Sequence, residues 1–437
     1  MTAPKVPALH IDEELKRKLL FTLLAVFIYR VGAHITAPGV NVQALVQFIQ
    51  NSGAQGFFQL YDTLGGGLYR ATIFALGIMP YISASIIFQL AGGIVPSIGK
   101  MQKDEEGRKK LTQWTRYMTI FIAFSQAYTF TLFTESIPGA IANPGIASRL
   151  TMVFTLTAGA IFVMWLGEQI TERGIGNGMS MLIAVSIIER LWPATIEMFG
   201  SVRNNVISGG GALLIVVMAV GAIAAVVAMT IASRRIPIQI PRKVMGRGRI
   251  REGQKTFIPI RLITAGVMPI VFAQTIIIVP GTIAQFTKNQ TLMDLANYFA
   301  PGDLAYNIAF AVMVLLFSYF YTSIIFNSVD LAENLKKQGG FIPGVKPGAA
   351  TADYIDSVLS RVTLPGAIFL AVIAILPIVV AQQIGFQSVF GGTSVLIVVG
   401  VLLDTIAQVE QHRTLRKYDS FMKTGRVKFR GRQQRFM

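Results

Sequence analysis

The chain has 437 residues, of which 53% are hydrophobic and only 14% are charged, and its formal net charge is +17. Because a soluble domain carries about 25% charged residues, this composition excludes an ordinary water-soluble fold and favours a protein embedded in lipid. The sequence has no cysteine and three scattered histidines, which excludes disulfides, thiolate metal sites and a histidine-based zinc or haem centre.

Ten apolar segments are each long enough to cross a bilayer as a helix of about 20 residues. In chain order they cover 18–36, 72–94, 113–134, 151–169, 179–197, 212–232, 262–284, 305–326, 362–382 and 392–411. Helix is the expected conformation because lipid offers no partner to an unpaired backbone group. Several prolines lie within these windows, and we expect neighbouring helices to satisfy the carbonyls that they free: Pro80, Pro269, Pro280 and Pro377. The sequence therefore predicts an all-α integral membrane protein with ten transmembrane helices.

The cations lie almost entirely on one side of the predicted membrane. Of the 39 Lys and Arg residues, 33 fall in termini or connections on one side when the spans alternate. The exceptions are Arg30, Arg70, Arg149, Arg190, Arg203 and Lys288. Because cytoplasmic loops carry the excess of positive charge, the side with 33 cations is predicted to be cytoplasmic. Both termini are then cytoplasmic, which requires an even number of spans.

A motif with the pattern Gly-(Ile/Val)-Met-Pro-x-(Ile/Val)-x-Ala occurs in two of the windows. It begins at Gly77 in the second window and at Gly266 in the seventh. The two windows are five spans apart, so the copies have opposite orientations, which is typical of inverted repeats with a pathway between the halves. Chance similarity among apolar helices is the alternative, although Gly, Met and Pro match in register. We predict two pseudo-symmetric halves of five helices, 1–205 and 206–437.

The segment at about 57–67 is apolar but too short to span the membrane. It ends in three glycines, Gly65–Gly67, which form a hinge free of Cβ restrictions. The residue types leave two interpretations open, a re-entrant half-helix that can move and an extracytoplasmic surface loop.

Two long cytoplasmic connections and the tail carry most of the positive charge. In 233–261, β-like runs at Ile236–Ile240 and Thr256–Ile260 flank a basic tip, which predicts a hairpin. Its nine cations indicate either docking to an acidic protein or RNA or topogenic charge attracted to anionic membrane lipids. We expect a short helix and a turn-rich loop in 327–360, and a basic tail at 412–437 that is solvated or touches lipid.

The sequence contains no nucleophile–base constellation, Walker motif or dinucleotide-binding glycine loop, which predicts that the chain is not an enzyme and uses no cofactor. Asp404 is the main ionisable residue inside a predicted span, and a polar packing anchor is favoured over a proton carrier there. Energy for transport is therefore expected to come from a partner. A secondary transporter of a small solute and a non-transporting membrane scaffold for ribosomes are the alternatives.

Four long motifs resemble those of the SecY family, the central channel subunits of the bacterial Sec protein translocase. They are Ala75–Ile87, Trp165–Gly178, Asn334–Gly344 and Phe390–Val398. The resemblance implies a channel for unfolded secretory preproteins with signal sequences, which also releases membrane-protein segments laterally into the bacterial plasma (inner) membrane. It implies SecE and SecG as further subunits, and the SecA ATPase or the ribosome as the cytoplasmic driver.

The same resemblance assigns functional residues. The pore constriction is expected at Ile78, Ile82, Ile183, Val271 and Ile397. A ring of such branched apolar side chains surrounds a moving chain and, when empty, resists water and ions by dewetting. The resemblance favours a movable plug at 57–67, with Leu60, Tyr61, Leu64, Gly65 and Gly66.

The family's lateral gate and docking loops are also carried over. Polar candidates at the gate are Ser83, Ser85, Gln89, Gln274 and Thr275. Candidates for motor or ribosome docking are Arg242, Lys243, Arg247, Arg249 and Lys346. Lys346 stands where the family usually has arginine, so this position keeps its charge but loses bidentate hydrogen bonding.

Overall fold

A computed structural model describes residues 13–51, 67–239, 244–245, 249–250, 255–263, 266–287, 303–384 and 391–424. In these ranges, ten long helices each overlap one predicted span: α1 (Glu13–His34), α4 (Met79–Ile94), α6 (Glu105–Glu135), α7 (Ile146–Arg173), α8 (Gly178–Arg203), α9 (Gly209–Ile231), α10 (Met268–Thr287), α12 (Leu304–Ile325), α14 (Ala349–Gln383) and α15 (Gly392–Thr424). Shorter helices are α2 (Val42–Asn51), η1 (Leu68–Arg70), α5 (Pro96–Lys103) and α13 (Ser328–Lys337). The predicted ten-helix fold is confirmed.

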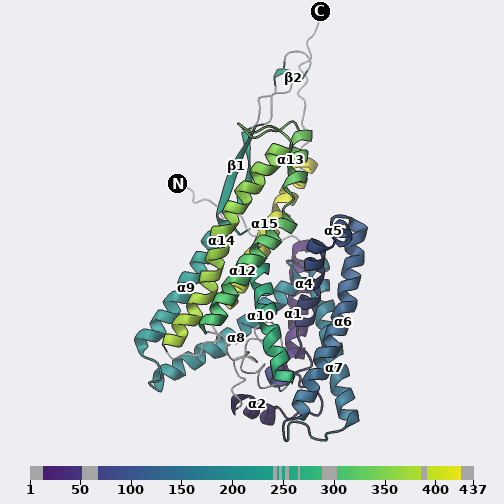
Figure 1. Ribbon diagram of the computed structural model, residues 1–437, viewed down its shortest axis with the longest axis vertical. Coiled ribbons are helices and arrows are strands. Elements are labelled where there is room, and N and C mark those ends of the chain that lie inside the picture. Colours follow the sequence, from purple (N-terminus) through teal and green to yellow (C-terminus); the bar gives the residue numbers. More distant parts are fainter. Residues whose placement is uncertain are drawn as a thin grey trace, which may run out of the picture.

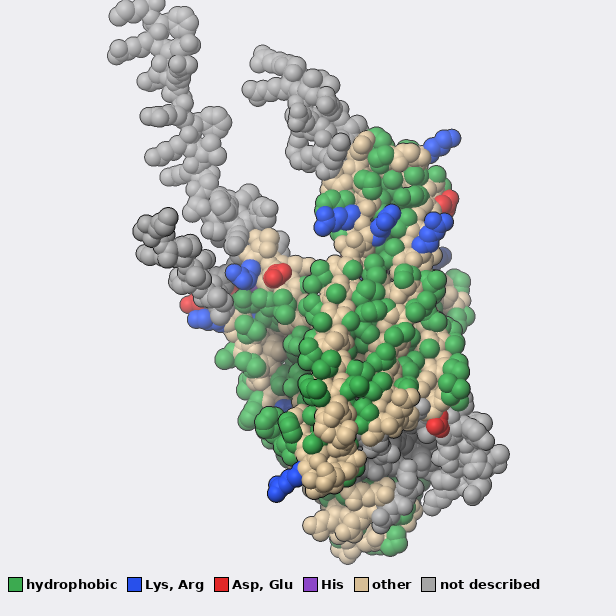
Figure 2. Space-filling model, turned by 90° about the vertical axis from the view of Figure 1, so that its left-hand side faces the viewer, with side chains coloured by type: hydrophobic (Ala, Val, Ile, Leu, Met, Phe, Trp, Pro, Cys, Tyr) green, Lys and Arg blue, Asp and Glu red, His purple; other side chains and the backbone are tan. Residues whose placement is uncertain are grey.

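Length and composition alone identify six of the described helices as membrane spans, namely α7, α8, α9, α12, α14 and α15. The pair α4 and α5 also passes, but the chain bends by 109° between them. The outward faces agree with a lipid environment, since large apolar side chains such as Leu20, Phe27 and Trp192 are more than half exposed. Figure 2 shows hydrophobic side chains over most of the middle of one face, with charged side chains mainly towards its ends.

The repeated motif begins a helix in both halves. Gly77 has φ 52° and Gly266 has φ 62°, in the left-handed region that favours glycine. Each glycine N–H donates to the carbonyl three residues earlier, and a helix begins two residues later, at Met79 and Met268. Pro80 then occupies the second helical position, where a missing N–H is tolerated.

Pro80 and Pro269 therefore free no carbonyl within these helices, because both lie in the first turn of a helix. The windows 72–94 and 262–284 also began too early, since apolar composition does not distinguish a buried turn from a helix. Pro377 does lie inside α14, together with Pro365.

The helices form two bundles (Figure 1). α1, α4, α6, α7 and α8 pack together, and α9, α10, α12, α14 and α15 pack together. Between bundles, α4 packs against α10, and α8 packs against α15 and the start of the second bundle at α9. The predicted division into two halves thus appears as two bundles that meet along two seams.

Two of the cations assigned to the outer side are paired with carboxylates. Arg30 on α1 forms an ion pair with Glu189 on α8, and Arg149 on α7 pairs with Glu135 on α6 at 2.7 Å. These pairs offset the positive charge on that side and tie neighbouring helices of the first bundle together.

The predicted hairpin between α9 and α10 is confirmed. Strand β1 (Ser233–Gln239) pairs antiparallel with β4 (Lys255–Arg261), and β2 (Val244–Met245) pairs with β3 (Arg249–Ile250). Gln239 and Phe341 exchange two backbone hydrogen bonds of 2.9 and 3.0 Å, which join the hairpin to the loop after α13. A small core binds these parts to the start of α14: Ile236, Ile260, Ile342, Ile355 and Leu359. The two long connections therefore form one projecting unit, at the top of Figure 1.

Close packing of α7 against the segment before α4 yields a testable prediction. A Cβ added to Gly159 on α7 would lie 2.0 Å from the carbonyl oxygen of Ile73, which cannot move without shifting backbone. Gly159→Ala is therefore expected to lower the melting temperature of the detergent-solubilised protein. Tryptophan fluorescence during heating measures this temperature. The control is Gly200→Ala on α8, where an added Cβ meets nothing within 4 Å. Because alanine favours a helix over glycine by about 1 kcal/mol, this variant is expected to unfold at the same temperature or higher. Equal losses in both variants would contradict the close approach.

Candidate functional site

A cavity of about 380 Å³ lies between the two bundles. Its lining comes from α4, α6, α7 and α8 of the first bundle and from α10, α12 and α15 of the second. A space bounded by both halves is what an inverted repeat with a central pathway requires.

One part of the cavity wall is an apolar ring. Ile82, Ile183, Val271 and Ile397 line the cavity, and all four are buried. They come from α4, α8, α10 and α15, so each bundle supplies two. Ile78 belongs to the same apolar core but does not line the cavity. The structure thus brings all five predicted constriction residues into one cluster.

The repeated helix start determines where two ring residues lie. The amide of Ile82 donates to the carbonyl of Ile78 at 3.1 Å, and the amide of Val271 donates to that of Val267 at 3.3 Å. These are the equivalent bonds of the first turns of α4 and α10. Because both helices begin only a few residues before, Ile82 and Val271 reach the cavity from equivalent positions in the two halves.

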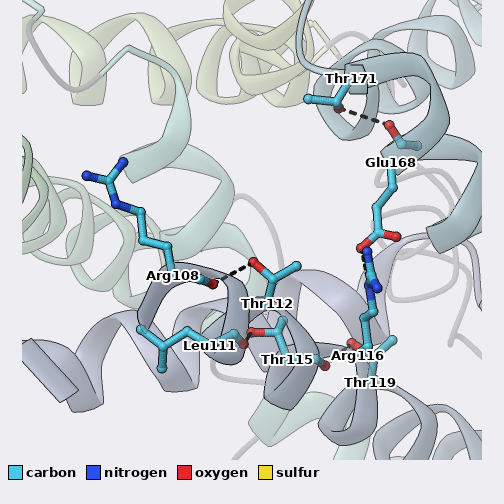
Figure 3. A network of polar contacts seen from close by, with 9 residues as sticks. Arg108, Leu111, Thr112, Thr115, Arg116, Thr119, Glu168 and Thr171 are labelled. Atoms are coloured by element: carbon cyan, nitrogen blue, oxygen red, sulfur yellow. Dashed lines mark hydrogen bonds and ion pairs between the residues drawn. The ribbon is translucent and has the colours of Figure 1, made fainter. Parts of the chain in front are cut away.

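Polar side chains make up another part of the wall, beside further apolar ones. Arg116 on α6 and Glu168 on α7 form an ion pair with Nε and Oε1 2.8 Å apart (Figure 3). Gln89 Nε2 donates to Ser85 Oγ at 2.9 Å on α4. Asn177 and Ser180 contribute from the start of α8, one to two turns before Ile183. The cavity therefore combines a polar mouth, near the α7–α8 connection, with the apolar ring.

The gate candidates lie in two different environments. Ser85 and Gln89 line the cavity, whereas Ser83 does not. Gln274 and Thr275 are buried in α10, the helix that packs against α4. Thr275 Oγ1 donates to the carbonyl of Val271 at 2.7 Å, but Gln274 Oε1 has no hydrogen-bond partner within the described part of the chain. An unsatisfied buried acceptor costs about 1–3 kcal/mol, so this helix carries a destabilising group close to the seam.

The plug and most docking candidates fall outside the described residues. These are Leu60, Tyr61, Leu64, Gly65, Gly66, Arg242, Lys243 and Arg247. Arg249 lies in β3, and Lys346 is exposed in the loop after α13, between Gly344 and Gly348 with φ of 83° and 111°.

Sequence reasoning did not single out two cations on the first strand of the hairpin. Arg234 and Arg235 on β1 are exposed, and the Arg235 guanidinium lies 4.8 Å from the centroid of the Phe257 ring. Their position on a strand that pairs next to a basic tip was the available signal. Asp404 also differs from expectation, because its side chain is exposed on α15 and does not line the cavity.

The chain is similar to known proteins over nearly its whole length. The family model SecY matches residues 72–406. The chain is 41% identical over 420 residues to "Protein translocase subunit SecY" of Aquifex aeolicus, covering 94% of this chain and 97% of that one. It is 39% identical over 427 residues to the protein of the same name from Escherichia coli K12, covering 96% of both.

Solved structures share the fold at low sequence identity. "The structure of a protein conducting channel" matches with a TM-score of 0.68 at 18% identity, covering 96% of both chains. A structure titled for the plug domain of a SecY protein matches at 0.66 and 17%, again covering 96% of both chains. The Sec61 chain of a canine ribosome-channel complex matches at 0.63 and 16%, with the same coverage.

The ion pair at the mouth can be measured by a double-mutant cycle. Arg116→Gln, Glu168→Gln and the double variant are expected to give a coupling of up to about 1 kcal/mol in thermal unfolding, a modest value because the Arg116 side chain is 42% exposed. The pair Glu105 and Lys109 on the same α6 surface is the control, since its side chains are 89% and 76% exposed at 4.0 Å. We expect no measurable coupling there, and a cavity pair coupled no more strongly than this control would contradict the assignment.

Proposed function

The chain belongs to the SecY family, and we propose that it forms the protein-conducting channel of a translocase, through which unfolded preproteins cross the membrane. The observation that carries this proposal is the buried ring of Ile82, Ile183, Val271 and Ile397, which both bundles contribute beside one polar-mouthed cavity.

The chemistry of the ring suits a moving polypeptide. Its side chains offer no hydrogen-bond donor or acceptor, so they hold no segment of a passing chain strongly. Branched apolar side chains also shed water when the pore is empty, which resists ion flow. The polar mouth, with its Arg116–Glu168 pair, admits a hydrated chain before it reaches the ring.

Lateral release is proposed along the seam between α4 and α10. The two helices pack against each other, and Gln274 Oε1, which has no hydrogen-bond partner among the described residues, lowers the stability of this arrangement. We propose that the segment 57–67 seals the resting pore. The fold that this chain shares with a structure titled for the plug domain of the SecY protein supports this proposal.

We propose that the projecting unit of the hairpin and the 327–360 connection faces the cytoplasm. The 33 cations on one side support this orientation, with both termini cytoplasmic in a bacterial plasma membrane.

SecE and SecG are the proposed companion subunits, and anionic lipids are the proposed neighbours of the basic tail. The SecA ATPase or the ribosome would dock on the projecting unit; the fold shared with a ribosome-bound Sec61 channel supports the second.

The alternative function, transport of a small solute, is not supported. The relatives with about 40% identity are translocase subunits, and Asp404, on which that alternative depended, does not line the cavity.

A photo-crosslinking residue at Ile82 or Ile397 tests the path of the substrate. An arrested preprotein is expected to crosslink at both positions, because both side chains line the cavity. Ile87 on α4 and Ile406 on α15 are matched controls, since they are 44% and 53% exposed on the outer surfaces of the same helices. Gel analysis of the adducts distinguishes the two pairs, and equal crosslinking at all four sites would refute a path through the ring.

Charge reversal tests the docking surface. Replacing Arg242, Lys243, Arg247 and Arg249 by Glu is expected to weaken SecA or ribosome binding at least tenfold at moderate salt, because the electrostatic attraction becomes repulsion. Membrane insertion, measured by protease accessibility, is expected to be the same as that of the unchanged protein. Lys109→Glu with Lys110→Glu, exposed on α6, controls for a general change in charge. Unchanged affinity in the hairpin variant would argue for a purely topogenic role.

A further inference from the structure

The connection between α7 and α8 is held by side chains from several helices. The amide of Ile175 donates to Thr22 Oγ1 on α1 at 3.1 Å, and the amide of Gly178 donates to Thr171 Oγ1 on α7 at 2.9 Å. Asn177 Oδ1 accepts from the amides of Met179 and Ser180 and so caps α8. Thr171 lies at the end of α7 beside the Arg116–Glu168 pair (Figure 3).

One further bond links this connection to the other bundle. The amide of Gly176 donates to Gln408 Oε1 on α15 at 2.9 Å. Gly176 is buried, whereas Gln408 is exposed, so the bond itself is partly buried. The N–H of a buried residue that loses its acceptor needs another partner. The bond therefore joins the backbone of the first half to a side chain of the second.

Glycine is required for this approach. Gly176 has φ 87°, and a Cβ there would lie 3.1 Å from Thr405 Oγ1 on α15. A Cβ at Gly178 would lie 1.9 Å from the carbonyl oxygen of Gly167 on α7. The backbone of 174–178 is thus packed directly between α7 and α15, and a small displacement of either helix changes its contacts.

The connection also lies at the mouth of the cavity. Asn177 and Ser180 line the cavity, and the ring residue Ile183 follows within the next turn of α8. On the other side of the bond, α15 carries the ring residue Ile397 and continues towards the basic tail. Gly176 and Gln408 therefore connect the chain just before α8 to α15, and each of these two helices carries a ring residue.

We propose that Gln408 is a positioning residue that holds the 174–178 connection to α15 in the closed channel and releases it when the bundles separate. This inference rests on the proposed channel function. Separation of α8 from α15 would withdraw the acceptor from a buried N–H, so the bond adds to the stability of the closed state only. Loss of the bond is then expected to shift the population towards the open state.

The test compares three variants of the full chain in its complex, reconstituted into lipid bilayers. Gln408→Ala removes the acceptor and is expected to raise the resting ion conductance about fivefold, which corresponds to about 1 kcal/mol. Gln408→Glu keeps an acceptor oxygen and is expected to restore conductance close to that of the unchanged protein. Gln411→Ala removes an exposed glutamine one turn further along α15 and is the control, expected to leave conductance unchanged.

Two results would overturn the inference. Gln408→Ala could conduct no more than Gln411→Ala, or it could lower the melting temperature while resting conductance stays constant, which indicates a structural role alone. Preprotein translocation by the unchanged protein is measured in parallel. If conductance responds to Gln408 as expected but no preprotein crosses, the proposed function fails and the positioning role stands.

Discussion

Every backbone polar group within the lipid must find a partner inside the protein, and the arrangement of the pore depends on how this chain meets that requirement. Most of the chain meets it with continuous helices. The segment just before α4 does not, because it is non-helical and yet buried, with Ala75 and Leu76 almost fully covered. Its amides and carbonyls pair with the chain just after α1: Ala37 donates to Ala71 at 2.8 Å, and Ile73 donates to Ile35 at 2.9 Å. Irregular backbone is therefore tolerated here because protein, rather than lipid, surrounds it.

This late helix start has a functional consequence. If the helix were continuous through 72–94, nothing in its backbone would turn the equivalent residues of the two halves towards the pathway. The turns at Gly77 and Gly266 fix the residue at which α4 and α10 begin. Ile82 and Val271 therefore occupy equivalent positions in the first turns of the two helices. The placement of these two residues in the cavity wall is thus a product of backbone geometry as much as of apolar side chains.

Sequence reasoning located what depends on composition along the chain and missed what depends on contact in space. Apolar length located the ten helices, and alternation with a basic tip located the hairpin, since both are local patterns. Window boundaries failed at Pro80 and Pro269, because apolar residues fill buried turns as readily as helices. Arg116 and Glu168 are 52 positions apart in the sequence, and no local pattern shows that they pair. The bond between Gly176 and Gln408, 232 positions apart, was inaccessible for the same reason.

The projecting unit and the ring are separated by a short length of chain. Strand β4 ends at Arg261, and Val271 follows ten residues later. Leu262, between them, donates to the carbonyl of Ala232 at 3.0 Å, and its own carbonyl lies where a Cβ on Gly366 of α14 would be 2.5 Å away. The chain leaving the hairpin is therefore fixed both to the end of α9 and to α14 immediately before the turn at Gly266. Because closely packed protein interiors transmit strain, a partner that moved the hairpin would displace Leu262 and, through its contacts, the adjoining parts of α9 and α14.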